Sequence, residues 1–475
     1  MIKSSAQMKT MHLIIGIIVA VVLANLPGPG SITQHGMALI GTFIVANYWF
    51  IAIDMITGSL ASLVMFVLLS GTPAATAIAS VFGNTTIWQM LVVLPLIYGL
   101  RVTGVDDALT GWMVSRKALR SRPTMFVVFF LLTCSLLCAL KVHPLVMLAL
   151  AESVMSVGGY MERTKEHDAF LVSTFFASAL ASNIIPYGSW VAGFVASFEA
   201  ISGVPLDQAT YMLFGIALNI VLDILYVVVM SLFLKCDFSR LEKIDLNALQ
   251  VTQTQFTKRG RFMLLLFLVM IVGAFLPTLF GAFAVSIFIN ETLTVGLWFT
   301  LCLVAALVVP IEGKPVIEAV DSFKNGIIWP LIFTASVMLY YSGIIGSDEA
   351  GIRAALSDLF SGVFTGLPGI VLLLCACALT IIVTGFFSNM ATGVIFMSAT
   401  IPLASVFNLS PLVLGVCIMW ASQPGYITPG GTGTSPYLHT LTTINEKNKY
   451  KFIFVFLAVY LVVLLAFGTV MNAFF

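Results

Sequence analysis

Charge is scarce in this chain. Asp, Glu, Lys and Arg make up 9% of its 475 residues and hydrophobic residues make up 60%, whereas soluble domains carry about 25% charged residues. This composition excludes a soluble globule and predicts an all-α polytopic membrane protein in contact with the lipid bilayer. The net charge is +1 and basic tracts are missing, so we expect no nucleic-acid partner.

Clustered catalytic side chains are missing as well. The five histidines are dispersed, the seven cysteines mostly lie inside apolar runs, and no apolar run holds paired carboxylates or a His-Glu motif. An intramembrane enzyme would need such a cluster, so an enzyme is only a remote alternative. We expect no cofactor other than a sodium ion.

Long apolar runs recur from Met11 to Phe475. Each span needs roughly 20 apolar residues, so the runs predict about 11 transmembrane helices together with re-entrant pieces. The first run follows Lys3 and Lys9 and lacks a small-residue cleavage site, so we interpret it as a retained helix rather than a signal peptide. Three carboxylates fall inside apolar runs, where such residues usually face a bundle interior or a cavity: they are Asp54, Glu152 and Asp223.

An internal repeat of about 242 residues organises the chain. Four signatures recur in the same order at nearly one offset. Gly71-Thr72-Pro73 returns as Gly313-Lys314-Pro315, Asn84-x-x-Ile87-Trp88 as Asn325-x-x-Ile328-Trp329, Gly104-x-Asp106 as Gly346-x-Asp348, and Ile185-Pro186-Tyr187-Gly188 as Thr428-Pro429-Gly430-Gly431. Aligning the two hairpin centres at an offset of 249 places Ala139–His143 opposite Ser388–Thr392.

Loop charges indicate that the two copies are inverted, because cytoplasmic loops collect Lys and Arg. A segment with Arg116, Lys117, Arg120 and Arg122 has an equivalent with Asp348, Glu349 and Asp358. The rule predicts a multi-pass protein of the cell membrane with a cytoplasmic N-terminus and an outside C-terminus. The predicted units are scaffold helices 1–70, a first repeat 71–235 (hairpin 123–157, broken helix 168–202), a cytoplasmic linker 236–260, scaffold helices 261–312, a second repeat 313–440 (hairpin 366–405, broken helix 410–440) and a C-terminal helix 441–475.

Inverted repeats with hairpins and broken helices are typical of secondary transporters, whose binding sites lie at the discontinuities. Four discontinuities are visible: the hairpin tips 139–143 and 388–393, and the unwound loops 182–189 and 428–434. Carbonyls freed by Pro and Gly can ligate a cation, and helix N-termini can face an anion. Candidate substrate contacts are Asn183, Pro186, Thr392, Pro429, Gly430 and Thr432, and the hydroxyls of Thr428, Thr432, Thr434 and Ser388 with the Gly431 loop are candidate sodium ligands.

The chain resembles the divalent-anion:sodium symporter family, within the ion-transporter superfamily that includes arsenite and sodium/proton permeases. The resemblance covers the whole chain in architecture and is strongest at Ser388-Asn389 and at the Pro429-Gly430-Gly431-Thr432 loop. It implies that Ser388 and Asn389 contact the anion and help to ligate sodium. It also implies a homodimer that works as an elevator, with the hairpin domain sliding past a fixed scaffold.

Both tips depart from that family, which has Ser-Asn-Thr in each tip. The second tip has Met390 in place of the threonine, and the first tip keeps nothing of the motif. Ala139 and Leu140 offer no polar side chain, and Lys141 lies there instead. An ammonium inside a membrane is a functional candidate by default: Lys141 would replace a cation or counter an anionic substrate. The alternative is a lysine that snorkels to water. His143 is either a titrating group for proton coupling or a structural histidine.

The sequence therefore predicts a secondary active transporter of a small anion, a di- or tricarboxylate, with sodium symport, proton coupling and exchange all open. The alternative is an arsenite-type or sodium/proton antiporter of the same superfamily. A cation cargo would call for an acidic residue at the midplane, and none of the four discontinuities carries Asp or Glu.

Overall fold

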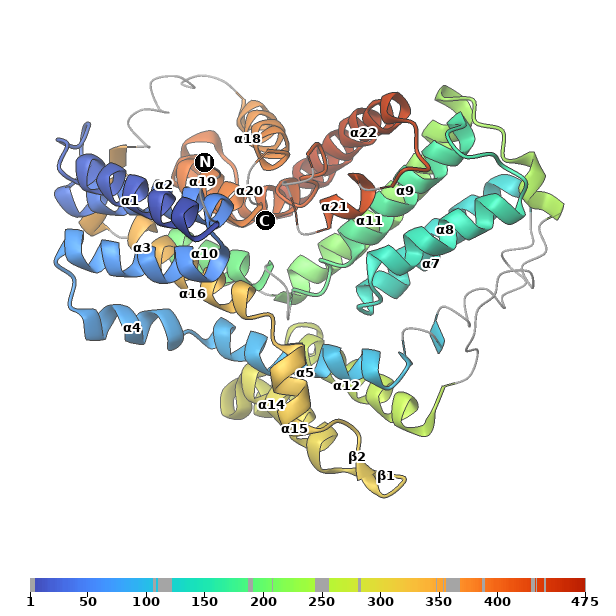
Figure 1. The fold of residues 1–475 in the computed structure, drawn as a ribbon, viewed down its shortest axis with the longest axis horizontal. Helices are drawn as coiled ribbons and strands as arrows, with labels where there is room; N and C mark the ends of the chain where they lie inside the picture. Colours follow the sequence, from blue (N-terminus) through green and yellow to red (C-terminus); the bar gives the residue numbers. More distant parts are fainter. Residues whose placement is uncertain are drawn as a thin grey trace.

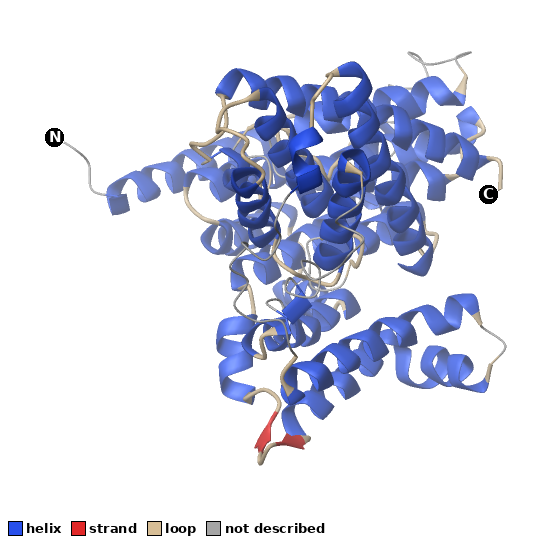
Figure 2. Ribbon diagram, turned by 90° about the vertical axis from the view of Figure 1, so that its right-hand side faces the viewer, coloured by secondary structure: helices blue, strands red, loops and turns tan. Residues whose placement is uncertain are grey.

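A computed structural model of the chain is almost entirely helical in the part that it describes (Figure 2). The described residues are 5–105, 108–109, 122–186, 191–206, 208–243, 256–280, 283–346, 348–352, 354–355, 368–386, 389–428, 432, 434–439 and 441–474. The predicted basic segment at 110–121 and part of its acidic equivalent lie outside these residues.

The helices α1, α2 and α3 pack in sequence at one side of the molecule, whereas α5 packs against α12, α14 and α15 (Figure 1). The indole of Trp49 covers Gly16 and donates a hydrogen bond to His12 O at 3.0 Å, so α1 and α2 approach closely. The helices are α1 (Ser5–Ala24), α2 (Gln34–Ala52), α3 (Met55–Ser70), α4 (Ala74–Phe82) and α5 (Thr85–Val102).

The next elements form the hairpin and the broken helix of the first half. Both hairpin arms, α7 and α8, pack against α9, and α11 packs against α7 and α9. Figure 1 shows this group on the side of the molecule opposite α1–α3. The elements are α7 (Pro123–Ala139), α8 (Pro144–Val157), α9 (Lys165–Ala181), α10 (Val191–Ser202), α11 (Gln208–Val228), η2 (Val229–Phe233) and η3 (Ser239–Lys243).

The middle of the chain repeats the packing device seen at the N-terminus. The indole of Trp298 covers Gly273 and donates to Met270 O at 3.2 Å, as Trp49 does on Gly16. The elements are α12 (Lys258–Leu279), α13 (Ala284–Ile287), η5 (Phe288–Leu293), α14 (Thr294–Val308), the antiparallel pair β1 (Pro310–Ile311) and β2 (Lys314–Pro315), α15 (Ala319–Gly326), α16 (Trp329–Gly346) and η6 (Asp348–Ala350).

The last third of the described chain again consists of a hairpin, a broken helix and a long helix. Its elements are α18 (Gly369–Thr384), α19 (Asn389–Thr400), η7 (Ile401–Phe407), α20 (Pro411–Ala421), α21 (Ser435–His439) and α22 (Glu446–Asn472). The long helix α22 packs against α9, α11, α18 and α20. It therefore joins the two halves in one core.

Small residues set the contacts between the halves. A Cβ on Gly193 in α10 would lie 2.3 Å from Met390 Cε in α19, and one on Gly393 would lie 2.4 Å from the Phe194 ring. Gly215 in α11 accommodates the Trp420 ring, which stacks on Tyr211 with ring centroids 5.2 Å apart. The hairpin of the second half thus lies against the broken helix of the first.

Among the described residues, six helices are long and apolar enough to cross a membrane, or seven if the pair α15–α16, bent by 66°, counts as one span. Seven further apolar helices have 10–17 residues, among them both arms of the first hairpin and pieces of the broken helices. The chain is thus an all-helical, multi-pass membrane protein, and the count of about 11 spans stays a prediction.

Candidate substrate and ion site

The first unwound loop begins where α9 ends at Ala181. The Ser182 hydroxyl and the Asn183 side-chain amide both donate to the Ala179 carbonyl, at 2.8 and 3.0 Å. These bonds satisfy a carbonyl of the last turn, which has no helical partner of its own. Asn183, predicted as a substrate contact, therefore ends the helix, and its backbone carbonyl accepts from Tyr211 at 3.3 Å.

The second unwound loop begins in the same way, 240 residues later. The Ser422 hydroxyl and the Gln423 amide both donate to Met419 O, at 2.8 and 3.1 Å. Ala181-Ser182-Asn183 and Ala421-Ser422-Gln423 are thus equivalent helix ends. Since the later signature repeats at an offset of 243, the second loop is longer by the three residues Pro424-Gly425-Tyr426.

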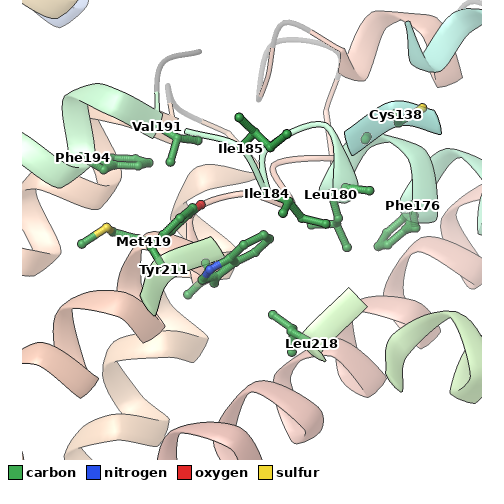
Figure 3. Close-up of a cluster of buried hydrophobic side chains, with 14 of the residues drawn as sticks. Cys138, Phe176, Leu180, Ile184, Ile185, Val191, Phe194, Tyr211, Leu218 and Met419 are labelled. Atoms are coloured by element: carbon green, nitrogen blue, oxygen red, sulfur yellow. The ribbon is translucent and has the colours of Figure 1, made fainter. Parts of the chain in front are cut away.

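Lys141 joins the first hairpin to the first unwound loop. The helix α7 ends at Ala139, and Lys141 turns the chain with a positive φ of 71°. Its ammonium donates to Ser182 O at 2.8 Å and to Ile185 O at 2.9 Å. The apolar side chains around this loop are buried (Figure 3). Lys141 is therefore partly buried and bound to loop carbonyls.

The second hairpin uses neutral groups at the corresponding place. The Asn389 amide donates to Gln423 O at 3.1 Å, and the Thr384 hydroxyl lies within hydrogen-bonding distance of Ser422 O (2.9 Å) and of Asn389 Oδ1 (3.1 Å). A Cβ on Gly425 would lie 2.6 Å from Thr384 O and 2.9 Å from Asn389 Oδ1. The longer loop closes on the hairpin only because residue 425 is glycine.

The helix ends correct the predicted hairpin alignment. The helices α7 and α18 end at Ala139 and Thr384, and α8 and α19 begin at Pro144 and Asn389. These ends are 245 residues apart, so the offset of 249 is wrong by about one helical turn. Sequence marked only the second of these ends, because Gly385 follows Thr384 whereas Ala139 is followed by Leu140. Lys141 consequently lies opposite Phe386, and Pro144 opposite Asn389.

His143 connects the two halves. Its Nδ1 accepts the Leu145 N–H at 3.2 Å, which caps the start of α8, and its ring contacts the Tyr437 ring of α21 with centroids 5.2 Å apart. The distance between Tyr437 Oη and His143 Nε2 is 3.4 Å. The histidine thus has a structural role at the first tip, beside the second broken helix.

The remaining predicted residues fall into three groups. Pro186 is buried at the end of the described part of the first loop. Thr392, 1% exposed on α19, has no hydrogen-bond partner for its hydroxyl in the part of the chain that the structure describes. Ser388, Pro429, Gly430 and Gly431 lie outside the described residues.

Three of the predicted sodium ligands stabilise the second loop itself. The Thr428 hydroxyl donates to Gly385 O at 2.7 Å. The Thr432 hydroxyl oxygen accepts the N–H groups of Thr434 and Ser435, at 3.3 and 3.0 Å. Thr432 also lies close to Gly425, because a Cβ added to Gly425 would lie 2.9 Å from Thr432 Cγ2.

The three carboxylates in apolar runs differ in environment. Asp54 does not face a bundle interior: it caps α3 by accepting the Thr57 N–H at 2.8 Å and pairs with Lys9, and its side chain is 41% exposed. Glu152 accepts from the Thr443 hydroxyl at 2.5 Å. Asp223 is 1% exposed and accepts from Ser135 at 2.6 Å.

Sequence reasoning missed Thr384, Ser422, Gln423 and Gly425. The repeated Ala-Ser-Asn and Ala-Ser-Gln triplets at an offset of 240 were the available signal for Ser422 and Gln423. Gly425 lies in the insertion, which has no counterpart in the first half, so the repeat could not reveal it.

Two solved structures share the fold over nearly the whole chain. The YdaH transporter of Alcanivorax borkumensis is 13% identical, with 99% of this chain and 98% of that chain covered at a TM-score of 0.52. MtrF of Neisseria gonorrhoeae, described among a class of antimetabolite efflux pumps, is 12% identical, with 98% and 95% covered at a TM-score of 0.59. No family model and no curated protein sequence matches the chain. The chain thus shares its fold with two membrane transporters, and the finer family resemblance stays a prediction.

Proposed function

We propose that the protein is a secondary active transporter of a small carboxylate anion in the cell membrane. The anion would bind where the hairpin turns meet the unwound loops. The observation that carries this proposal is the ammonium of Lys141, held between the carbonyls of Ser182 and Ile185.

Lys141 has the geometry of a fixed cation with one donor to spare. An ammonium has three N–H donors, and the carbonyls of Ser182 and Ile185 take two. No partner for a third is present among the described residues. A carboxylate oxygen would satisfy this donor and compensate the buried charge, and a buried charge is costly unless it is paired.

The second half-site suits a sodium ion or the uncharged parts of the cargo. It brings together side-chain oxygens of Asn389 and Thr384 with loop carbonyls of Ser422 and Gln423. Hard cations prefer such oxygen ligands. Ser388, Thr428, Gly431, Thr432 and Thr434 would complete a sodium site, and Thr392 offers an unpaired hydroxyl to either ligand.

The contacts in each half connect a hairpin to an unwound loop, so hairpin and broken helix would move as one body. We therefore retain a homodimeric elevator, with α1–α3 and α12–α14 as the scaffold. The N-terminus would be cytoplasmic and the C-terminus outside. Symport with sodium, coupling to protons and exchange are the coupling modes to be distinguished.

The test is a ligand screen followed by transport. Purified protein is melted in detergent with small mono-, di- and tricarboxylates and inorganic oxyanions, in sodium or choline buffer. A ligand at 100 times its Kd stabilises the protein by about 2.7 kcal/mol. The best stabiliser is then assayed for counterflow in proteoliposomes. The proposal predicts counterflow of at least one carboxylate, and a carrier that exchanges none of them, or only cations, would refute it.

A further inference from the structure

We propose that Asp223 binds the proton that couples anion transport to the pH gradient, which makes the protein a proton:anion symporter. This inference rests on the proposed function, because it uses the charge of Lys141 at the anion site. It assigns a role to a buried carboxyl that lies outside that site.

Asp223 lies in the last third of α11, five residues before its end at Val228, with 1% of its surface exposed. One carboxyl oxygen accepts the Ser135 hydroxyl of α7 at 2.6 Å, and the other has no hydrogen-bond partner in the described chain. A buried carboxylate needs pairing or several donors, and otherwise it takes up a proton. A single hydroxyl donor is too little, so this carboxyl is suited to alternate between its charged and neutral forms.

No cation compensates Asp223 from the elements around it. Its titratable neighbours are the Cys134 thiol of α7 and the Tyr226 hydroxyl of α11. The ion pairs of the described chain do not include it. The helices α9, α12 and α22, which pack against α11, carry their charged residues near their N-terminal ends, and η2 carries no charged residue. The charged residues are Lys165, Glu166, His167 and Asp168 in α9, Lys258, Arg259 and Arg261 in α12, and Glu446, Lys447, Lys449 and Lys451 in α22.

Ser135 can serve both forms of the carboxyl. Its hydroxyl lies 2.6 Å from Asp223 Oδ2 and 3.3 Å from Ala177 O. When Asp223 is charged, the hydroxyl donates to the carboxylate. When Asp223 carries a proton, the acid donates to the Ser135 oxygen and the hydroxyl turns to the Ala177 carbonyl. Neither state leaves a donor without an acceptor.

Proton binding would be coupled to anion binding through the net charge of the mobile core, by which we mean the hairpins, the broken helices and the helix α11 that packs against α7 and α9. The empty core holds the Lys141 ammonium and the Asp223 carboxylate, which cancel. With a monovalent anion bound, the charges cancel only if Asp223 is protonated. A net charge in the bilayer core is costly, so the core would cross the membrane in this neutral form. A dianion would reach the same balance with one sodium ion at the second half-site. Cores with only the anion or only the proton carry net charge, so their crossing is disfavoured.

Lys141 and Ser135, the hydrogen-bond donor to Asp223, lie on one hairpin arm. Ser135 is in the last two turns of α7, and Lys141 follows the end of that helix by two residues. Both contact the broken helix α9–α10, Ser135 through Ala177 O and Lys141 through Ser182 O. A change at Asp223 is thus transmitted to the anion site by one helix end.

The experiment compares two transport modes of Asp223→Asn in proteoliposomes, using the carboxylate with the largest wild-type counterflow. Asn mimics the neutral acid, so we expect counterflow within about threefold of wild type and a loss of at least about tenfold in accumulation driven by a pH gradient. An internal pH dye should report anion-dependent acidification for wild type and none for the variant. The control, Asp237→Asn, changes an exposed carboxyl and should behave as wild type.

Gradient-driven accumulation by Asp223→Asn at the wild-type level would overturn the proposal.

Ser135→Ala decides the question if Asp223→Asn does not fold. It removes the donor that stabilises the charged carboxyl, so half-maximal uptake should shift to higher pH. An unshifted profile would then overturn the proposal. Absence of any anion counterflow in wild type would instead refute the proposed function.

Discussion

Asn183 and Gln423 make the same hydrogen bond 240 residues apart: each side-chain amide donates to the carbonyl four residues earlier, at 3.0 and 3.1 Å. Each bond ends a helix at the beginning of an unwound loop. The two broken helices therefore have equivalent ends, although one residue is Asn and the other Gln.

Replacing either amide should destabilise the protein to a similar extent. Asn183→Leu and Gln423→Leu each remove one buried hydrogen bond, which is worth about 1 kcal/mol. The loss should appear in thermal melts in detergent as a lower midpoint for both variants. Asn445→Leu, which removes a cap at the exposed start of α22, provides a comparison outside the loops. A large loss for one amide variant and none for the other would contradict the equivalence.

Gly425 should tolerate no side chain. A Cβ there would lie 2.6 Å from Thr384 O and 2.9 Å from Asn389 Oδ1, and backbone atoms cannot yield as flexible side chains do. Gly425→Ala should therefore separate the loop from the hairpin and lower anion counterflow by at least about tenfold, a loss of roughly 1.4 kcal/mol in binding. Gly296→Ala, where the nearest atom would lie 3.5 Å from the new Cβ and φ is not positive, tests whether any Gly→Ala change has this effect. Wild-type counterflow in Gly425→Ala would exclude this packing.

The contact between Gly193 and Met390 predicts a compensating pair. Gly193→Ala places a methyl group 2.3 Å from Met390 Cε, and overpacking of this kind costs about 1–3 kcal/mol. Met390→Ala removes the clashing atom, so the loss of stability in the double variant should be smaller than the sum of the two single losses. Melting midpoints of the four proteins form a double-mutant cycle. Additive changes would show that α10 and α19 do not pack as described.

Local patterns predicted part of this architecture well. The apolar runs identified an all-helical membrane protein, and the Pro and Gly residues after Asn183 marked a helix break. Asp54 was misinterpreted because a helix-capping carboxylate between two apolar helices looks like an intramembrane charge in sequence. The offset of 249 failed because the end of α7 at Ala139 inside an apolar run has no glycine to mark it, as Gly385 marks the end of α18.

The partners of the candidate site could not be predicted from sequence. Lys141 stood out as a charge at a hairpin turn, but its partners are backbone carbonyls of Ser182 and Ile185, and carbonyls have no sequence signature. The hydrogen-bond partner of Asp223 could not be predicted either. Its single donor, Ser135, is 88 residues away, and only packing brings the two helices together.

Lys141 carries the central claim, and anion counterflow by Lys141→Met tests it most directly. Met keeps most of the length and the apolar stem but removes the ammonium. We expect counterflow to fall at least about a hundredfold, because two charge-assisted hydrogen bonds of about 1.5–3 kcal/mol each and the charge opposite the anion are lost together. The matched control is Lys258→Met, whose side chain is 77% exposed and which should transport at the wild-type rate. Monodisperse Lys141→Met protein with wild-type anion counterflow would contradict the account.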